Sequence, residues 1–277
     1  MKRWLVPVVL LCALAACRDQ APESRVAETP ADGQQAAPVD APASGPVVLE
    51  DVVETDSRYI IGITWPEGAD RYPGLAVLLK EYADAARADV LQAAEAIEPG
   101  TDAMYDLALE FKVIADTPQL FAVAADGGSY TGGAHGSPLI ARFVWLPQEQ
   151  RLLTARELIP AAASWREVSG YVREQLHAAL SQRVDADELD PAERERIMRS
   201  AGRMIDEGTA PEAENFAQFE PVTGADGRLV ALRFVFPPYQ VGPYSDGVQT
   251  VEVPAQVLLP HVAPAYRPLF SATPPAQ

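Results

Sequence analysis

The alternation of side chains in residues 105–113 is the feature that most limits how this chain can fold. Apolar side chains stand at the odd positions of this segment, while Asp106, Glu110 and Lys112 stand between them. Successive side chains of a strand point to opposite faces, so the segment predicts a strand with one buried and one solvated face. This pattern is typical of an antiparallel sheet that faces a core on one side only.

Other segments show either the same strand-like alternation or apolar residues at helical spacing. Period-2 or short apolar runs predict strands at 59–65, 120–124, 139–146, 216–222, 229–236 and 248–253. Apolar residues at helical spacing predict helices at 73–97, from 165 onward, at 191–208 and, briefly, at 255–262. The order of elements predicts an α+β fold: an antiparallel sheet with helices packed on one side, in two sequential mixed halves.

Local motifs add detail to these elements. A hydroxyl residue three positions before a glutamate, at Thr154 and again at Ser164, predicts two capping boxes at helix starts. The glycine-rich stretch 126–136 is expected to separate two strands. In segment 229–236 the alternate apolar residues are expected to share a buried face; they are Val230, Leu232, Phe234 and Phe236.

The N-terminus is similar to a bacterial lipoprotein signal. A positive Lys2-Arg3 pair and an apolar run precede Leu14-Ala15-Ala16-Cys17. The run is too short to cross a bilayer. The resemblance implies cleavage after residue 16 and acylation of Cys17, which would attach the protein to a lipid membrane. Arg18 stands where an Asp would mark inner-membrane retention, so by analogy we expect the periplasmic side of the outer membrane.

A proline- and alanine-rich segment follows the predicted anchor. Residues 17–46 lack apolar periodicity and predict a disordered tether. The predicted organisation is a signal peptide at 1–16, the tether at 17–46, two halves at 47–152 and 153–270, and a tail at 271–277. Cleavage would remove Lys2 and Arg3 and change the net charge from -17 to -19.

The composition argues against several function classes. Acidic residues number 39 against 22 Lys and Arg, with no extended basic run, so no nucleic-acid partner is expected. After cleavage only Cys17 would remain, which excludes a disulfide within the mature chain. The three histidines have no metal-ligand spacing, and no nucleophile elbow, phosphate loop or dinucleotide fingerprint is present. We therefore predict neither an enzyme nor a bound metal or cofactor.

Two short passages supply the candidate site residues. In the first, Tyr130, Gly132, Gly133 and His135 lie in the sequence Tyr-Thr-Gly-Gly-Ala-His-Gly. In the second, a strand runs into a proline- and glycine-rich bend that contains Tyr239 and Tyr244. Glycines that accept positive φ suit a tight turn, and tyrosine rings either pack inward or meet a sugar or peptide. Both the scaffold and the ligand-contact interpretations stay open.

Both passages resemble the RsiV/PdaC-type domain of unknown function. The resemblance spans roughly residues 58–270, and an extra Pro237-Pro238 pair departs from the pattern. The family occurs in many lipoproteins and on the extracellular side of a lysozyme-sensing anti-sigma factor. It implies a tethered binding module for lysozyme or a related cell-wall enzyme. Two alternatives remain: a peptidoglycan-binding module, and a structural or assembly lipoprotein of the envelope.

Overall fold

The structure, a computed structural model, describes residues 47–98, 100–187 and 189–271. These residues belong to one compact unit of the chain. The predicted signal peptide, Cys17 and the tether lie outside the described residues, as does the tail from residue 272 onward. The domain boundaries placed at residues 16, 46, 152 and 270 therefore stay predictions.

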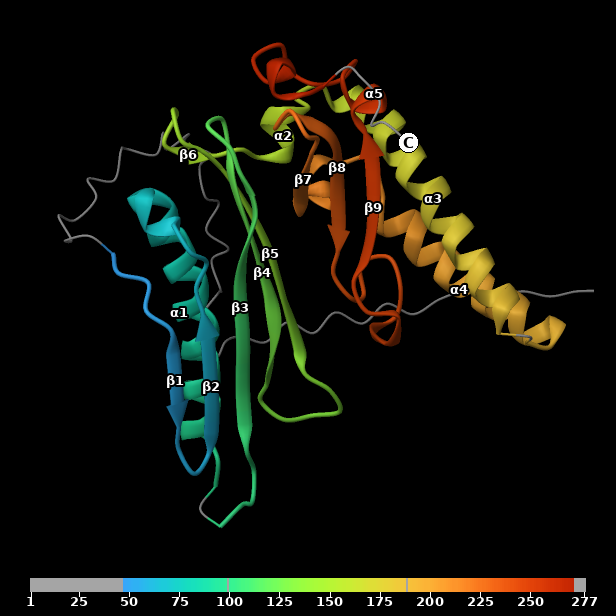
Figure 1. The fold of residues 1–277 in the computed structure, drawn as a ribbon. Coiled ribbons are helices and arrows are strands. Elements are labelled where there is room, and N and C mark those ends of the chain that lie inside the picture. Colours follow the sequence, from blue (N-terminus) through green and yellow to red (C-terminus); the bar gives the residue numbers. More distant parts are fainter. Residues whose placement is uncertain (1–46, 99, 188, 272–277) are drawn as a thin grey trace, which may run out of the picture. The chain divides into compact units, whose positions relative to one another are not determined.

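The first half of the described body is a six-stranded sheet whose spatial order follows the sequence (Figure 1). Its strands are β1 (Val52–Thr55), β2 (Tyr59–Thr64), β3 (Tyr105–Asp116), β4 (Phe121–Tyr130), β5 (Ser137–Leu146) and β6 (Arg151–Leu152). Every neighbouring pair is antiparallel except β2 and β3, which are parallel. The parallel pair arises because helix α1 (Pro73–Glu95) carries the chain back before β3 begins.

Helix α1 covers one face of this sheet (Figure 1). It begins at Pro73, whose missing N–H leaves no unpaired donor at a first helical position, and it ends at Glu95, close to the predicted residue 97. Leu75, Leu79 and Val90 are fully buried on its inner side. They pack with Leu107, Leu109 and Phe111 of β3, which confirms the predicted alternation up to residue 111. Val113 differs from the prediction: the strand pairing shifts between Val113 and Ala115, and the Val113 side chain is exposed.

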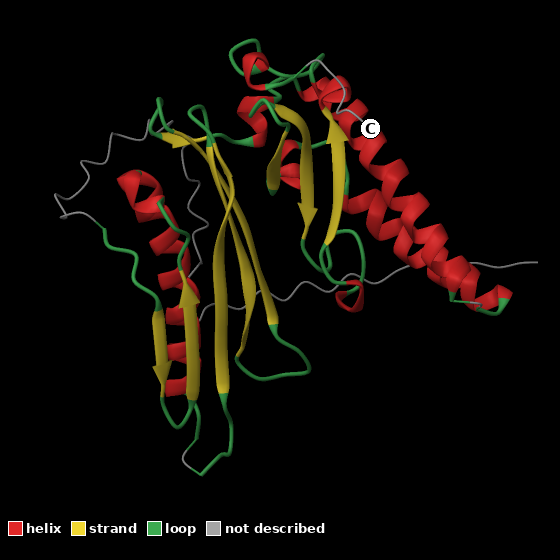
Figure 2. Cartoon of the chain, viewed as in Figure 1, coloured by secondary structure: helices red, strands yellow, loops and turns green. Residues whose placement is uncertain are grey.

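The second half consists of a three-stranded antiparallel sheet and four α-helices (Figure 2). Its strands are β7 (Phe219–Thr223), β8 (Leu229–Phe236) and β9 (Gln249–Pro254). Its helices are α2 (Ala155–Leu158), α3 (Trp165–Ala186), α4 (Pro191–Gly208) and α5 (Ala255–Leu258). The α+β fold class is thereby confirmed, with five α-helices among the described residues.

Aromatic rings form the centre of the second core. Phe216 is fully buried, stacks on Trp165 with ring centroids 5.0 Å apart, and meets Phe234 edge-on at 5.2 Å. In β8, Leu232, Phe234 and Phe236 are buried as predicted, whereas Val230 is only half-buried. The neighbouring residues Ala231 and Val235 are buried too, so side chains on both faces of this central strand are buried.

Two local predictions differ from the structure. Strand β4 extends to Tyr130, so the loop expected at 126–136 is reduced to its last six residues. Gly127 explains the extension, since any Cβ there would overlap the Ala108 carbonyl oxygen of the paired strand. The capping box forms at Thr154 but not at Ser164. A 3₁₀ turn precedes Trp165 and places Ser164 in helical geometry (φ -66°), from which no side-chain cap forms.

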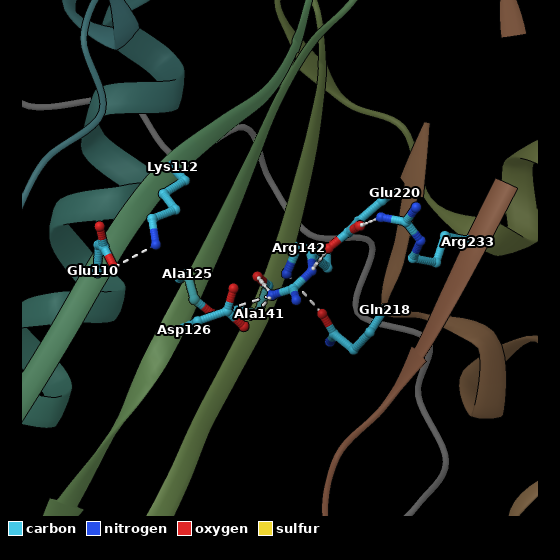
Figure 3. A network of polar contacts seen from close by, with 9 residues as sticks. All are labelled: Glu110, Lys112, Ala125, Asp126, Ala141, Arg142, Gln218, Glu220 and Arg233. Carbon is cyan, nitrogen blue, oxygen red and sulfur yellow. Dashed lines mark hydrogen bonds and ion pairs between the residues drawn. The ribbon is translucent and has the colours of Figure 1, made fainter. Parts of the chain in front are cut away.

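A polar network joins the two sheets (Figure 3). Arg142 of β5 donates its backbone N–H to Gln218 Oε1 at 2.7 Å, and its Nε to Glu220 Oε1 of β7 at 2.6 Å. Arg142 also pairs with Asp126 at 2.9 Å, while Glu220 Oε2 accepts from Arg233 at 3.2 Å. The Arg142 and Glu220 side chains are 6% and 8% exposed, so this is a buried ion pair.

Candidate functional site

The turn between β4 and β5 is built by its glycines and one tyrosine. Gly132 and Gly133 have φ of 102° and 95°, which side chains larger than glycine rarely adopt. The Tyr130 hydroxyl donates to the Gly133 carbonyl oxygen at 3.1 Å, and its ring meets Tyr105 edge-on at 6.5 Å. Tyr130, Gly132 and Gly133 therefore shape the turn that holds His135.

The connection between β8 and β9 contains a strained tyrosine. Tyr239 has φ of 74°, and its N–H donates to the Gly242 carbonyl oxygen at 3.0 Å. The next residue fixes the bend, because Gln240 Nε2 donates to the carbonyl oxygens of Gly208 and Asn215 at 3.0 and 2.8 Å. Gly208 has no room for a side chain, since a Cβ there would overlap the Gln240 carbonyl oxygen. The surrounding contacts thus hold Tyr239 in an unfavourable backbone conformation.

The two connections meet through their aromatic side chains. The His135 ring stacks on Tyr244, with centroids 4.1 Å apart and an interplanar angle of 17°. The Tyr239 hydroxyl lies 2.7 Å from His135 Nε2, and the Tyr239 ring lies 5.7 Å from that of Tyr244. We call His135, Tyr239 and Tyr244 the aromatic cluster. The β4–β5 turn of the six-stranded sheet supplies His135, and the β8–β9 connection of the three-stranded sheet supplies both tyrosines.

Both ring nitrogens of His135 have hydrogen-bond partners. The Gly136 carbonyl oxygen, 3.0 Å from His135 Nδ1, can only accept, so Nδ1 carries the proton. The other ring nitrogen, Nε2, lies 2.7 Å from the Tyr239 hydroxyl. Both ring nitrogens are thus occupied. The arrangement presents an accessible aromatic surface in which one hydroxyl and one imidazole are hydrogen-bonded to each other.

The second tyrosine is held by an ion pair at the end of its short helix. Tyr244 and Asp246 belong to the 3₁₀ turn η4 (Tyr244–Asp246). Asp246, whose side chain is 18% exposed, pairs with Arg183 of α3 at 2.6 Å. The Gln249 side chain donates to the Asp246 carbonyl oxygen at 2.6 Å. The position of Tyr244 is therefore tied to helix α3 and strand β9.

The cluster remains accessible at its surface. Tyr239 is 53% exposed, His135 is exposed and Tyr244 is half-exposed. Within the described ranges, no three His, Cys, Asp or Glu side chains are close enough to hold a metal ion. In the same part of the chain, no helix has the length and hydropathy needed to cross a membrane.

All six predicted residues of the folded body lie in the aromatic cluster or in the turn that holds His135, although His135 and Tyr239 are 104 positions apart. The sequence interpretation missed Gln240 and Asp246, which fix the tyrosine bend. Both lie inside the passage already singled out, so their polar side chains among glycines and prolines were the available signal. It also missed Arg142 and Glu220, for which the sequence offers no comparable signal.

Comparison with known proteins adds a family match and a fold. Residues 166–256 match a family described as "Protein of unknown function (DUF3298)". None of the curated proteins compared with the chain matches it. The crystal structure of a DUF3298 family protein from Pseudomonas aeruginosa PAO1 is 18% identical, with a TM-score of 0.53, covering 82% of this chain and 98% of its own.

A second crystal structure, of a DUF3298 family member from Bacteroides fragilis NCTC 9343, is 15% identical over 78% of this chain and 93% of its own, with a TM-score of 0.48. The matched residues 166–256 run from α3 into α5 and include Tyr239 and Tyr244, while His135 precedes them. The chain thus contains a segment that matches DUF3298, a domain of unknown function, and it shares its fold with the Pseudomonas protein of that family.

Proposed function

We propose that this protein is a non-enzymatic binding module of the cell envelope, and that the aromatic cluster is its contact surface. In this proposal acylated Cys17 holds it on the periplasmic side of the outer membrane. Its partner is lysozyme or a related wall-cleaving enzyme. One observation carries the proposal: loops from two sheets bring His135, Tyr239 and Tyr244 into one accessible cluster of rings.

The structure of the bend supports a contact role more than a purely structural one. A turn alone does not need a tyrosine at φ 74°, where glycine is favoured. Backbone strain of this kind gathers at ligand-binding positions, because only the surrounding structure maintains it. Tyrosine is also a common interface residue, since its ring buries apolar area and its hydroxyl still finds a polar partner.

Charge supports a basic partner. The net charge of -17 becomes -19 if the signal peptide is removed. A negative surface accelerates association with a positively charged enzyme and makes the affinity depend on salt. Such steering also suits an enzyme that acts beside the membrane to which the module is attached.

Peptidoglycan is the second candidate, and the exposed Tyr239 ring favours it. An accessible aromatic face can stack on the apolar face of a sugar ring. If neither lysozyme nor peptidoglycan binds, the remaining proposal is a structural or assembly lipoprotein that docks on other envelope proteins.

The direct test is a pull-down of the full chain on immobilised lysozyme and, separately, on insoluble peptidoglycan. We expect retention on lysozyme at about 50 mM salt and release by about 300 mM, because screening lengths fall to a few ångströms over this range. His135→Ala should reduce retention, while His177→Ala, on helix α3, should not. Retention on peptidoglycan alone would transfer the proposal to the glycan, and no retention on either would reject both.

A further inference from the structure

A cavity lies behind the bend that carries the tyrosines of the aromatic cluster. It has a volume of about 230 Å³ and lies between α3, α4 and the β8–β9 connection. Five buried apolar side chains line it: Leu176, Leu180, Ala201, Ile205 and Val241. Exposed Ala179 and the Arg183–Asp246 pair also line it, and their exposure places them at its opening.

We infer that this cavity is the anchor site for one apolar side chain of a basic partner protein that also contacts the aromatic cluster. The inference rests on the proposed function and names the kind of group that the partner inserts. The cavity and the cluster share a short segment, because Asp246 lines the cavity and Tyr244 begins the same 3₁₀ turn. A partner seated on the tyrosines would therefore lie next to the opening.

The size of the cavity fits a single side chain. Pockets for small-molecule ligands usually have about 300–1,000 Å³, which is larger than this cavity. An apolar cavity of about 150 Å³ already holds a benzene molecule. A leucine, phenylalanine or tryptophan side chain from a partner therefore fits, whereas a disaccharide of the cell wall does not.

The chemistry of the cavity also favours an apolar group. Arg183 and Asp246 are already paired at 2.6 Å, and Gln249 Nε2 already donates to the Asp246 carbonyl oxygen. The buried side chains of the lining are all aliphatic and offer no donor or acceptor to a sugar, and a buried hydroxyl without a partner is unfavourable. The acidic net charge of the chain favours a basic partner around the inserted group, while the paired Arg183 and Asp246 leave the opening itself without net charge.

Two alanines on α3 provide a matched test. Ala179 lines the cavity, whereas the adjacent Ala178 is also exposed but lies outside the lining. In the full chain, Ala179→Trp should fill the opening and weaken lysozyme binding by at least about tenfold, the usual effect of losing an interface anchor. Ala178→Trp should change the affinity by less than about twofold, and both variants should keep the same melting temperature.

A second arm tests the cavity without lysozyme. Indole and isoamyl alcohol imitate tryptophan and leucine side chains. At millimolar concentration they should shift the methyl resonances of Leu176 and Val241 in the full chain and in Ala178→Trp, but not in Ala179→Trp. If neither probe shifts these resonances in the unaltered chain, the anchor site is refuted.

The two arms separate the inference from the proposed function. If lysozyme binds and both tryptophan variants bind equally well, the anchor site is wrong and the proposed function stands. If lysozyme does not bind but the probes do, the proposed lysozyme partner is wrong and the apolar anchor site stands. If Ala179→Trp instead abolishes retention on insoluble peptidoglycan, the assignment of the cavity to a protein side chain is overturned.

Discussion

Replacing Arg142 by methionine should strongly destabilise the protein. Its side chain is 6% exposed and pairs with Glu220, which is 8% exposed. Its Nη1 also donates to the Ala125 and Ala141 carbonyl oxygens at 3.3 and 2.9 Å. Methionine keeps much of the apolar volume but supplies none of these donors, so the Glu220 carboxylate stays buried without its closest partner.

The expected loss of unfolding free energy depends on the partner that Glu220 retains. Removing one member of a buried ion pair destabilises a protein by about 3–5 kcal/mol. Glu220 keeps Arg233 at 3.2 Å, although that side chain is 40% exposed, so we take the lower end, about 3 kcal/mol. At about 2–4 °C per kcal/mol for a body of this size, the melting temperature should fall by roughly 6–12 °C.

A double variant isolates the buried charge from the lost packing. Adding Glu220→Leu to Arg142→Met removes the unpaired carboxylate, and apolar replacements of buried ion pairs are often close to neutral. The double variant should therefore regain about 2 kcal/mol relative to the single variant. Arg156→Met is the control, because Arg156 pairs with Glu214 at the exposed surface and such pairs contribute about 0–1 kcal/mol.

Urea denaturation at pH 7, followed by far-ultraviolet circular dichroism, gives these free energies. The reasoning is refuted if Arg142→Met loses less than about 1 kcal/mol, since the buried pair would then contribute no more than a surface pair. It is equally refuted if the double variant is no more stable than the single one.

Further predictions concern α3, the helix cap and the anchor. Gly170→Ala should stabilise the protein by about 0.5–1 kcal/mol in thermal or urea unfolding, because this exposed helical position leaves open space for a methyl group; a loss of stability would contradict the stated geometry. Thr154→Ala should destabilise by about 1 kcal/mol at pH 7. Desolvation acts to raise the pKa of Glu157, but hydrogen bonds from Thr154 and the charge of Arg151 outweigh it, so the pKa is lowered. The stabilisation from this carboxylate is complete above its unfolded pKa of about 4.3 and disappears as pH falls through the lowered folded pKa. The stability lost in Thr154→Ala should therefore become smaller in acid. A loss that stays constant down to about pH 2 would contradict this. Cys17→Ala should abolish incorporation of radioactive fatty acid and membrane association in fractionated cells, and unchanged labelling would rule out acylation at this residue.

The features that could be predicted from the sequence depend on interactions between residues close together in the chain. The alternation in 105–111, the apolar face predicted for 73–97 and the capping box at Thr154 each depend on residues a few positions apart. Ser164 shows the limit of such rules, since its spacing is identical but a preceding 3₁₀ turn places it in helical geometry. Tertiary context, which the motif does not contain, decides between the two outcomes.

Longer-range features could not be predicted in the same way. The parallel pairing of β2 with β3 depends on how α1 returns the chain, and the buried pair of Arg142 and Glu220 joins residues 78 positions apart. The candidate site lies between these extremes. Its residues were chosen within each loop, but the stacking of His135 on Tyr244 depends on the packing of two sheets.

One titration tests the central claim that the aromatic cluster is a contact surface. Lysozyme is titrated into the full chain, into His135→Ala and into Tyr244→Ala at low salt, and the melting temperature of each is recorded. We predict that both variants lose at least about tenfold in affinity while their melting temperatures change little. Absence of binding by the unaltered chain at high micromolar lysozyme would contradict the account, as would variants that are less stable but bind equally well.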